Sequence, residues 1–159
     1  MGIISNHAIR VQGINIAQPY LRTQAIHKAN GTAKVVQLFY YADVAAFDEC
    51  KDTPDNNRLD VPDTPFTRKY VTIFVTTDTS DIAYELVAVR DALIAEANTQ
   101  HEQDRTNALA LAQHTFDNLP KEQQTEQAVA DLAAQKASIN TEYDAKLWSS
   151  GDFEIEKLS

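Results

Sequence analysis

The sequence has a single cysteine, Cys50, among its 159 residues. One thiol excludes an intramolecular disulfide and leaves no second cysteine for a cysteine-based zinc site. Because Asp48 and Glu49 precede it directly, their negative charge disfavours a reactive thiolate at this position. Without a disulfide or a zinc site, the fold must be stabilised by packing. Because the sequence has no membrane-spanning run and no secretory signal pattern, we expect a reducing, cytoplasm-like compartment.

Glycine and histidine are also scarce. The four glycines stand alone, so no glycine-rich loop exists that could cradle a phosphate group. The four histidines lack the spacing of a metal motif, and His101 has no second histidine four residues further on. We therefore expect no catalytic site, no metal and no cofactor, and we expect that the protein is not an enzyme.

Long apolar runs are missing as well. No stretch approaches the ~18 consecutive apolar residues that a membrane-spanning helix needs, and the N-terminus lacks a charged start followed by an apolar block. The sequence therefore predicts no contact with a membrane.

Acidic residues are absent from residues 1–42, although the whole chain carries a net charge of −9. This stretch has a charge of +4 and the remainder −13; its basic residues are Arg10, Arg22, Lys28 and Lys34. One interpretation is solvated side chains on a β surface. The other is a basic face that docks an acidic neighbour, such as the acidic part of another copy. A nucleic-acid partner is disfavoured, because four basic residues are few and the acidic remainder repels phosphate.

The first half of the chain has strand patterns. Apolar residues alternate with polar ones on both sides of Gly13, which predicts two short extended pieces joined by a bulge or bend. Two longer runs, residues 20–28 and 33–41, flank Asn30-Gly31, which predicts a hairpin with a two-residue type I′ turn. The second run is apolar on both faces, so we expect a central strand that is covered on both sides.

A loop and a further strand follow. Residues 48–67 contain three prolines, five Asp and two Asn, which is typical of a loop, and its length suggests a contact loop. Residues 70–77 are rich in β-branched and aromatic side chains and predict a strand.

The pattern then changes to a helical period. Residues 81–118 predict one helix, with a break or a solvent-crossed stretch at 98–107, and residues 120–147 predict a second. Joined at Pro120, the two form an αα-hairpin that is too long for a compact core, so we expect it to act as an interaction arm. Leu109 and Leu111 lie about 200° apart around a helix, and we favour an arrangement in which Leu109 and Phe116 point outward as a docking patch.

The C-terminus returns to a strand pattern, because Phe153 and Ile155 alternate with glutamates. We expect these two residues to pair with a sheet edge, in this chain or in a neighbour. The sequence thus predicts an α+β fold with a small antiparallel sheet, a covering helix and a long C-terminal αα-hairpin. Its expected parts are a β-rich domain (1–97), the hairpin (98–148) and a strand-like tail (149–159).

The front half of the chain contains a series of short pieces: Tyr20-Leu21-Arg22, Asn30-Gly31, residues 35–41, Ala45-Ala46, residues 70–77 and Ile82-Ala83-Tyr84-Glu85-Leu86. With these pieces, about residues 9–94 resemble a family of short structural proteins from the tails and baseplates of tailed bacteriophages. The long loop at 48–67 and everything after Ala97 depart from the pattern of that family.

The resemblance implies a non-enzymatic virion protein, assembled in the host cytoplasm, whose partners are other virion proteins and further copies of itself. Three alternatives stay open. The first is a capsid decoration or neck protein, the second a cytoplasmic chaperone or adaptor that grips a client with its helical hairpin, and the third a small hydrolase without a familiar motif. The candidate interaction residues are Leu109, Phe116, Phe153, Ile155, Arg10, Arg22, Lys28 and Lys34.

Overall fold

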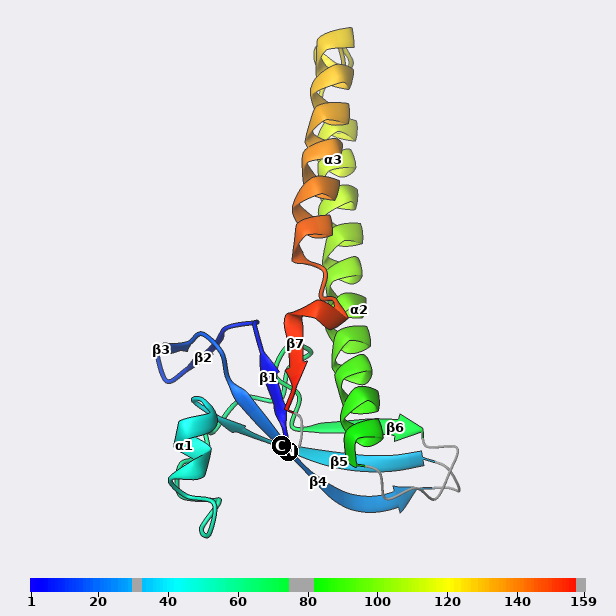
Figure 1. Ribbon diagram of the computed structural model, residues 1–159. Helices are drawn as coiled ribbons and strands as arrows, with labels where there is room; N and C mark the ends of the chain where they lie inside the picture. Colours follow the sequence, from blue (N-terminus) through cyan, green and yellow to red (C-terminus); the bar gives the residue numbers. More distant parts are fainter. Residues whose placement is uncertain (30–32, 75–81, 157–159) are drawn as a thin grey trace. The chain divides into compact units, whose positions relative to one another are not determined.

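The computed structural model describes residues 1–29, 33–74 and 82–156 (Figure 1). It confirms the α+β class, with an antiparallel sheet, a small hairpin sheet and a long C-terminal helical pair. The chain forms two compact units. Met1–Glu96 and the segment from Ser149 onward make the first, and Ala97–Trp148 make the second.

The main sheet of the first unit has five strands in the order β6-β5-β4-β1-β7, and every neighbouring pair is antiparallel. The strands are β1 (Ile3–Ser5), β4 (Tyr20–Ala29), β5 (Ala33–Tyr41), β6 (Tyr70–Phe74) and β7 (Phe153–Ile155). The predicted hairpin is confirmed, because β4 and β5 pair from Tyr20 opposite Tyr41 to Ala29 opposite Ala33. The turn that we predicted at Asn30-Gly31 lies outside the described residues, as do residues 75–77 of the predicted last strand.

Strand β5 is an interior strand, as predicted, but its two faces are not covered equally. Val36, Leu38 and Tyr40 on the inner face are buried, whereas Val35, Gln37 and Phe39 on the outer face are only half-buried. The expectation of full cover on both sides is therefore wrong over most of the outer face. The reason is that the short helix α1 (Val44–Asp48) covers only one end of that face.

That covered end has its own apolar cluster. Tyr20 and Tyr41 lie opposite each other on the outer side of the sheet and pack with Cys50 and Phe47. The ring centroids of Tyr41 and Phe47 are 5.1 Å apart, edge to face, and Asp43 caps α1 by accepting a hydrogen bond from the Ala46 amide at 2.8 Å. The lone cysteine is thus a buried packing residue.

Residues 49–69 form the predicted loop, and hydrogen bonds hold it against the sheet. The Tyr41 hydroxyl donates to the Pro54 carbonyl at 2.7 Å, and the Leu59 amide donates to the Tyr40 carbonyl at 2.7 Å. Further along, the Thr64 hydroxyl accepts from two backbone amides in a tight turn. The proposed role of this segment as a contact loop stays a prediction.

A second, two-stranded sheet consists of β2 (Ile9–Val11) and β3 (Ile14–Ile16). The predicted bulge or bend at Gly13 is a two-residue hairpin turn. Gln12 has a φ of 49° and Gly13 a φ of 86°, and two positive φ values are the signature of a type I′ turn. Glycine accepts that conformation without strain, which explains its position here.

Helix α2 (Ile82–Asp117) covers the inner face of the sheet at its N-terminal end (Figure 1). Leu86, Val89 and Leu93, spaced by three and four residues, are all buried, as the helical period predicted. The possible break at 98–107 is absent, because α2 is continuous there. Good helix formers fill this stretch, and the Gln100 amide donates to the Asp104 carboxylate one turn on, at 2.8 Å.

The second unit is the helical hairpin of α2 and α3 (Glu126–Lys146). Pro120 does not begin α3 as predicted. It precedes the 3-10 turn η1 (Lys121–Gln123), and the Thr125 hydroxyl caps α3 by accepting from the Ala128 amide at 3.2 Å. Polar bonds join the helices along their length. They are Arg105 to Asp144 at 2.6 Å and Lys136 to Gln113 at 2.6 Å.

The C-terminal strand β7 confirms the predicted pairing of Phe153 and Ile155. Ile155 lies opposite Ile3 and Phe153 opposite Ser5 on β1, so the segment that we set apart as 149–159 adds a strand to the sheet of the first unit. It is preceded by the turn η2 (Ser150–Asp152), which has a capping box between Ser149 and Asp152.

Side chains also tie this strand to the sheet. The Tyr20 hydroxyl donates to the Glu156 carboxylate at 2.5 Å, and His7 lies 3.2 Å from the Asp152 carboxylate. Burial, and next the hydrogen bond to Glu156, raise the pKa of Tyr20 to about 12. The hydrogen bond at Asp152 from the Ser149 backbone lowers the pKa of that carboxyl.

We predict that Tyr20→Phe destabilises the fold by about 1 kcal/mol, because Glu156 loses its donor but can still be solvated. Since the folded pKa of Tyr20 is raised, its contribution is complete below pH 10 and is lost as the pH rises from 10 through about 12. Denaturant unfolding between pH 8 and 12 should therefore show a shallower alkaline loss of stability in the variant. Equal alkaline slopes would contradict this assignment. Tyr40 and Tyr41, whose pKa values burial raises, and Lys146, whose pKa the hydrogen bond to Glu142 raises, contribute to the slope that is left.

Candidate interaction surface

The described residues contain no group of three His, Cys, Asp or Glu side chains arranged to hold a metal ion. That the protein binds no metal stays a prediction. Among the helices in the described ranges, none is both long and apolar enough to cross a membrane.

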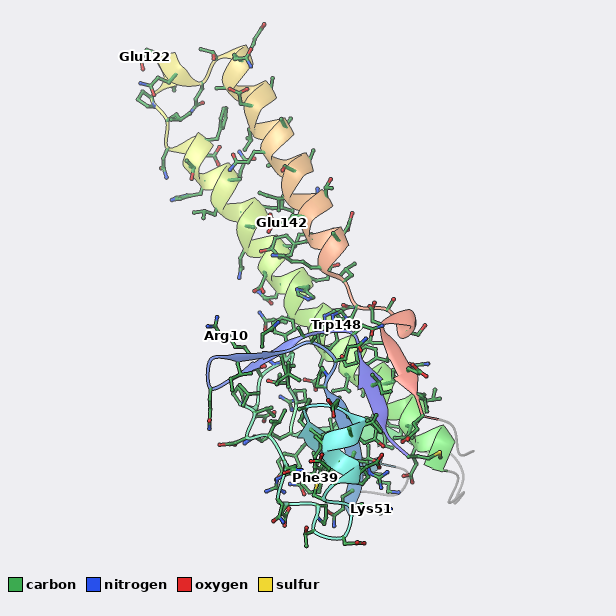
Figure 2. All side chains as sticks on the ribbon, turned by 60° about the vertical axis from the view of Figure 1, so that its left-hand side comes forward. Arg10, Phe39, Lys51, Glu122, Glu142 and Trp148 are labelled. Carbon is green, nitrogen blue, oxygen red and sulfur yellow. The ribbon has the colours of Figure 1, made fainter. Side chains whose placement is uncertain are left out.

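A cavity of about 290 Å³ lies beside β5 in the first unit. Its charged residues form pairs with each other: Arg58 with Asp55 at 3.0 Å, and Lys69 with Asp60 at 3.6 Å. The Arg58 guanidinium also stacks 4.7 Å from the centre of the Phe39 ring, which Figure 2 labels. The four charged side chains that line the cavity are therefore paired within the cavity wall.

The four basic residues of the N-terminal stretch do not share one face. Arg10 is exposed on the β2–β3 hairpin (Figure 2), whereas Arg22 lies on the outer face of the main sheet, stacked 4.5 Å from the Phe47 ring. Lys34 is on the inner face and pairs with Glu85 of α2. The side chain of Lys28 lies outside the described part of the chain. The single basic face that the charge pattern suggested is therefore not formed by Arg10, Arg22 and Lys34.

The helical hairpin also differs from the expected arrangement. Leu109 and Phe116, which we expected to point outward, are half-buried, while Leu111 is 66% exposed and Val129 is 53% exposed. The reason is that Leu109 and Phe116 lie on the same side of α2 as buried Ala112, three and four residues away, and thus in the seam with α3. Leu111 lies about 100° from Ala112 and turns out of the seam.

Among the described residues of the first unit, the most exposed large apolar side chain is Phe74, the last residue of edge strand β6. Phe74 is 70% exposed and Tyr70 is 43% exposed, and Thr72 between them is exposed as well. The three alternate with buried Val71 and Ile73, which face α2. The part of the outer face that lies away from α1 consists of side chains of β6 and β5: Tyr70, Thr72, Phe74, Ala33, Val35 and Gln37.

Sequence reasoning identified residues 70–77 as a strand but did not identify this surface. The signal was present, since Tyr70, Thr72 and Phe74 have the same parity in a strand and so must share one side. The sequence alone did not show which side α2 covers, because Val71 and Ile73 are equally apolar.

The other candidate residues are at the opposite edge of the sheet. Phe153 is buried and Ile155 is half-buried, and both are used within the chain by the pairing of β7 with β1. The edge strand β7 has only three residues and has Glu154 exposed on it, so it is short and charged. Over its described residues, the edge strand β6 is longer, with five residues, and has no charged side chain.

No protein-family model matches the chain, and comparison with curated proteins and with solved structures finds no similar protein.

We predict that replacing two of the basic residues changes the stability of the first unit by different amounts. Lys34→Ala should destabilise the first unit by about 1–2 kcal/mol, because Glu85 is left as an unpaired carboxylate that is only partly solvated. Arg10→Ala, at an exposed position, should change stability by less than about 0.5 kcal/mol. Denaturant unfolding measures both. An unchanged stability for Lys34→Ala, together with weaker association of the protein, would instead support a docking role for Lys34.

Proposed function

We propose that this protein is a non-enzymatic structural protein of a tailed-phage virion, acting by protein–protein contacts in the tail or baseplate. The observation that carries the contact role is the aromatic edge of β6, where Tyr70 and Phe74 are exposed on a strand without protective charge. The assignment to the tail or baseplate rests on the resemblance over residues 9–94.

An aromatic edge strand favours a role in assembly for two physical reasons. Within the described residues no strand lies beyond β6, so its outward backbone amides and carbonyls are open to water or to another chain. Its aromatic side chains are the type that is enriched at the cores of protein interfaces. A cluster of such features on one strand of a sheet is therefore typical of a contact surface.

The surroundings of the charged side chains and of the thiol support the non-enzymatic part of the proposal. The charged groups that line the cavity beside β5 form ion pairs with each other, and Cys50 is buried in an apolar cluster. Catalysis needs groups whose geometry and protonation are adjusted to a reacting atom.

A second candidate is a chaperone or adaptor, and one observation favours it. Leu111 and Val129 are exposed on the helical hairpin, where a client protein could bind. A capsid decoration or neck protein is a further alternative within the virion class, and it would use the same kind of contacts as a tail protein.

The test is the composition of purified particles. If the proposal is right, the chain is present in washed, intact particles in a fixed ratio to the major tail proteins, as measured by quantitative mass spectrometry. Its loss on washing, or its presence only in lysates, would contradict a structural role. Its presence in tail-less capsids would favour the decoration alternative.

Two matched variants separate the candidate surfaces. Phe74→Ser and Leu111→Ser remove apolar side chains of nearly equal exposure, 70% and 66%, from the sheet edge and from the helical hairpin. We predict that Phe74→Ser lowers incorporation into particles severalfold while Leu111→Ser does not, with folding of both checked by circular dichroism. The reverse result would move the contact surface to the hairpin and favour the client-binding alternative.

A further inference from the structure

The hydrogen-bond pattern of β5 and β6 shows which backbone groups of β6 face outward. The Leu38 amide donates to the Lys69 carbonyl at 2.8 Å, so positions 38 and 69 are opposed as in a hydrogen-bonded pair, although the Lys69 amide donates to the Asp63 carboxylate at 3.0 Å. Such pairs alternate along an antiparallel ladder, and Val71 and Ile73 therefore direct their amides and carbonyls to β5. Tyr70, Thr72 and Phe74 direct theirs away from the sheet.

We propose that β6 pairs antiparallel with β6 of a second copy, with Thr72 on the two-fold axis. Thr72 then lies opposite Thr72 of the second copy, and Tyr70 lies opposite Phe74 in both directions. The proposal rests on the proposed function, since it names a second copy as one partner of the contact surface.

The backbone favours this register over the others. When Thr72 lies opposite itself, all three outward residues of each copy form hydrogen-bonded pairs, which gives six intermolecular hydrogen bonds. A shift by two residues in either direction leaves outward groups of each strand without a partner within β6. A shift by one residue places outward groups of one strand against inward groups of the other.

The side chains are self-complementary in the same register. Each Tyr70 meets a Phe74 on the outer face, and aromatic cross-strand pairs are among the stabilising ones. On the other face, Val71 and Ile73 extend the apolar layer across the axis. The pattern aromatic, β-branched, Thr, β-branched, aromatic reads the same from both ends of the strand.

Charge complementarity also favours a second copy over a charged partner. Residues Tyr70–Phe74 carry no charge, so self-pairing brings no like charges together. The nearest charge, Lys69, pairs with Asp60 of its own chain. An acidic or basic partner strand would place its charge beside Tyr70 and Phe74 without an opposite charge on β6.

The buried area predicts that this contact is weak by itself. The exposed parts of Tyr70 and Phe74 amount to roughly 200 Å² per copy, well below the ~800 Å² per partner of a stable complex. The pairing should therefore be populated at high local concentration, as in an assembly, and covalent trapping is the suitable measurement.

The experiment uses single cysteines in the full-length chain, with buried Cys50 as the common background. In the proposed register, Thr72→Cys places two thiols on directly opposed residues, whose ~5.5 Å Cα separation is suited to a disulfide. Tyr70→Cys does not meet itself, because the two copies of residue 70 lie roughly 13 Å apart along the strands. The same holds for Phe74→Cys.

Under mild oxidation of concentrated protein, we expect a disulfide dimer from Thr72→Cys, little from Tyr70→Cys or Phe74→Cys alone, and a heterodimer from an equimolar mixture of those two. A Thr72→Cys dimer no more abundant than that of the unmodified chain would overturn the pairing. Equal dimer from Tyr70→Cys alone would overturn the register.

A charge test provides an independent check. Thr72→Lys and Thr72→Asp each place like charges on the axis and should lower association by up to about fivefold, while an equimolar mixture of the two should restore it as a heterodimer. Failure of the mixture to associate more than either variant alone counts against the axis. If the chain is incorporated into particles but Thr72→Cys forms no disulfide, the pairing is wrong and the proposed function stands. If Thr72→Cys forms the disulfide but the chain is absent from particles, the pairing stands and the proposed function is wrong.

Discussion

The packing of α2 on the inner face of the five-stranded sheet is the interaction on which the first unit depends. Leu86, Val89 and Leu93 lie on the side of the sheet where Val36 and Ile73 are buried. The edges of this layer are held by ion pairs, Lys34 with Glu85 and Arg68 with Glu96. A sheet must bury one face to be stable, and a single helix can cover only one. The outer face is consequently left to α1 at one end and to solvent at the other.

The second constraint is that strands from the two ends of the chain, β1 and β7, complete one edge of the sheet. Strand β1 lies between β4 and β7, so residues far apart in sequence must meet before this edge is complete. The Tyr20–Glu156 hydrogen bond and the capped turn at Ser149–Asp152 hold the short strand β7 in place. Because β7 is short and has exposed Glu154, this edge is protected against further pairing, whereas β6 is not. The difference between the two edges is the physical basis for placing the contact surface at β6.

The two units differ in how their apolar residues are used. In the first unit, large apolar side chains from strands and helix bury each other almost fully. In the described residues of the second unit, only Ala97 and Ala112 are buried. The other residues in the seam between the helices are half-buried, and polar bonds such as Arg105 to Asp144 join the two helices. A seam of this kind holds two helices together but buries too little area to form a large core. The apolar side chains of the hairpin are thus less deeply buried than those of the first unit, although α2 belongs to both units.

The sequence by itself determined the kinds of elements and much of their order. Alternation marked the strands, the change to a helical period marked α2 and α3, and the pattern at Phe153 and Ile155 predicted a strand that pairs with a sheet edge. These features are local, since they follow from the two-residue and 3.6-residue repeats of strands and helices. Tertiary structure decided which side of each element is used. Lys34 binds Glu85 while Arg22 faces outward, and Leu111 rather than Leu109 is exposed, because these outcomes depend on where α2 and α3 pack. The exposure of the aromatic side chains of β6 also depends on tertiary packing. The strand repeat separates the two sides of β6, but only the position of α2 determines which side is exposed.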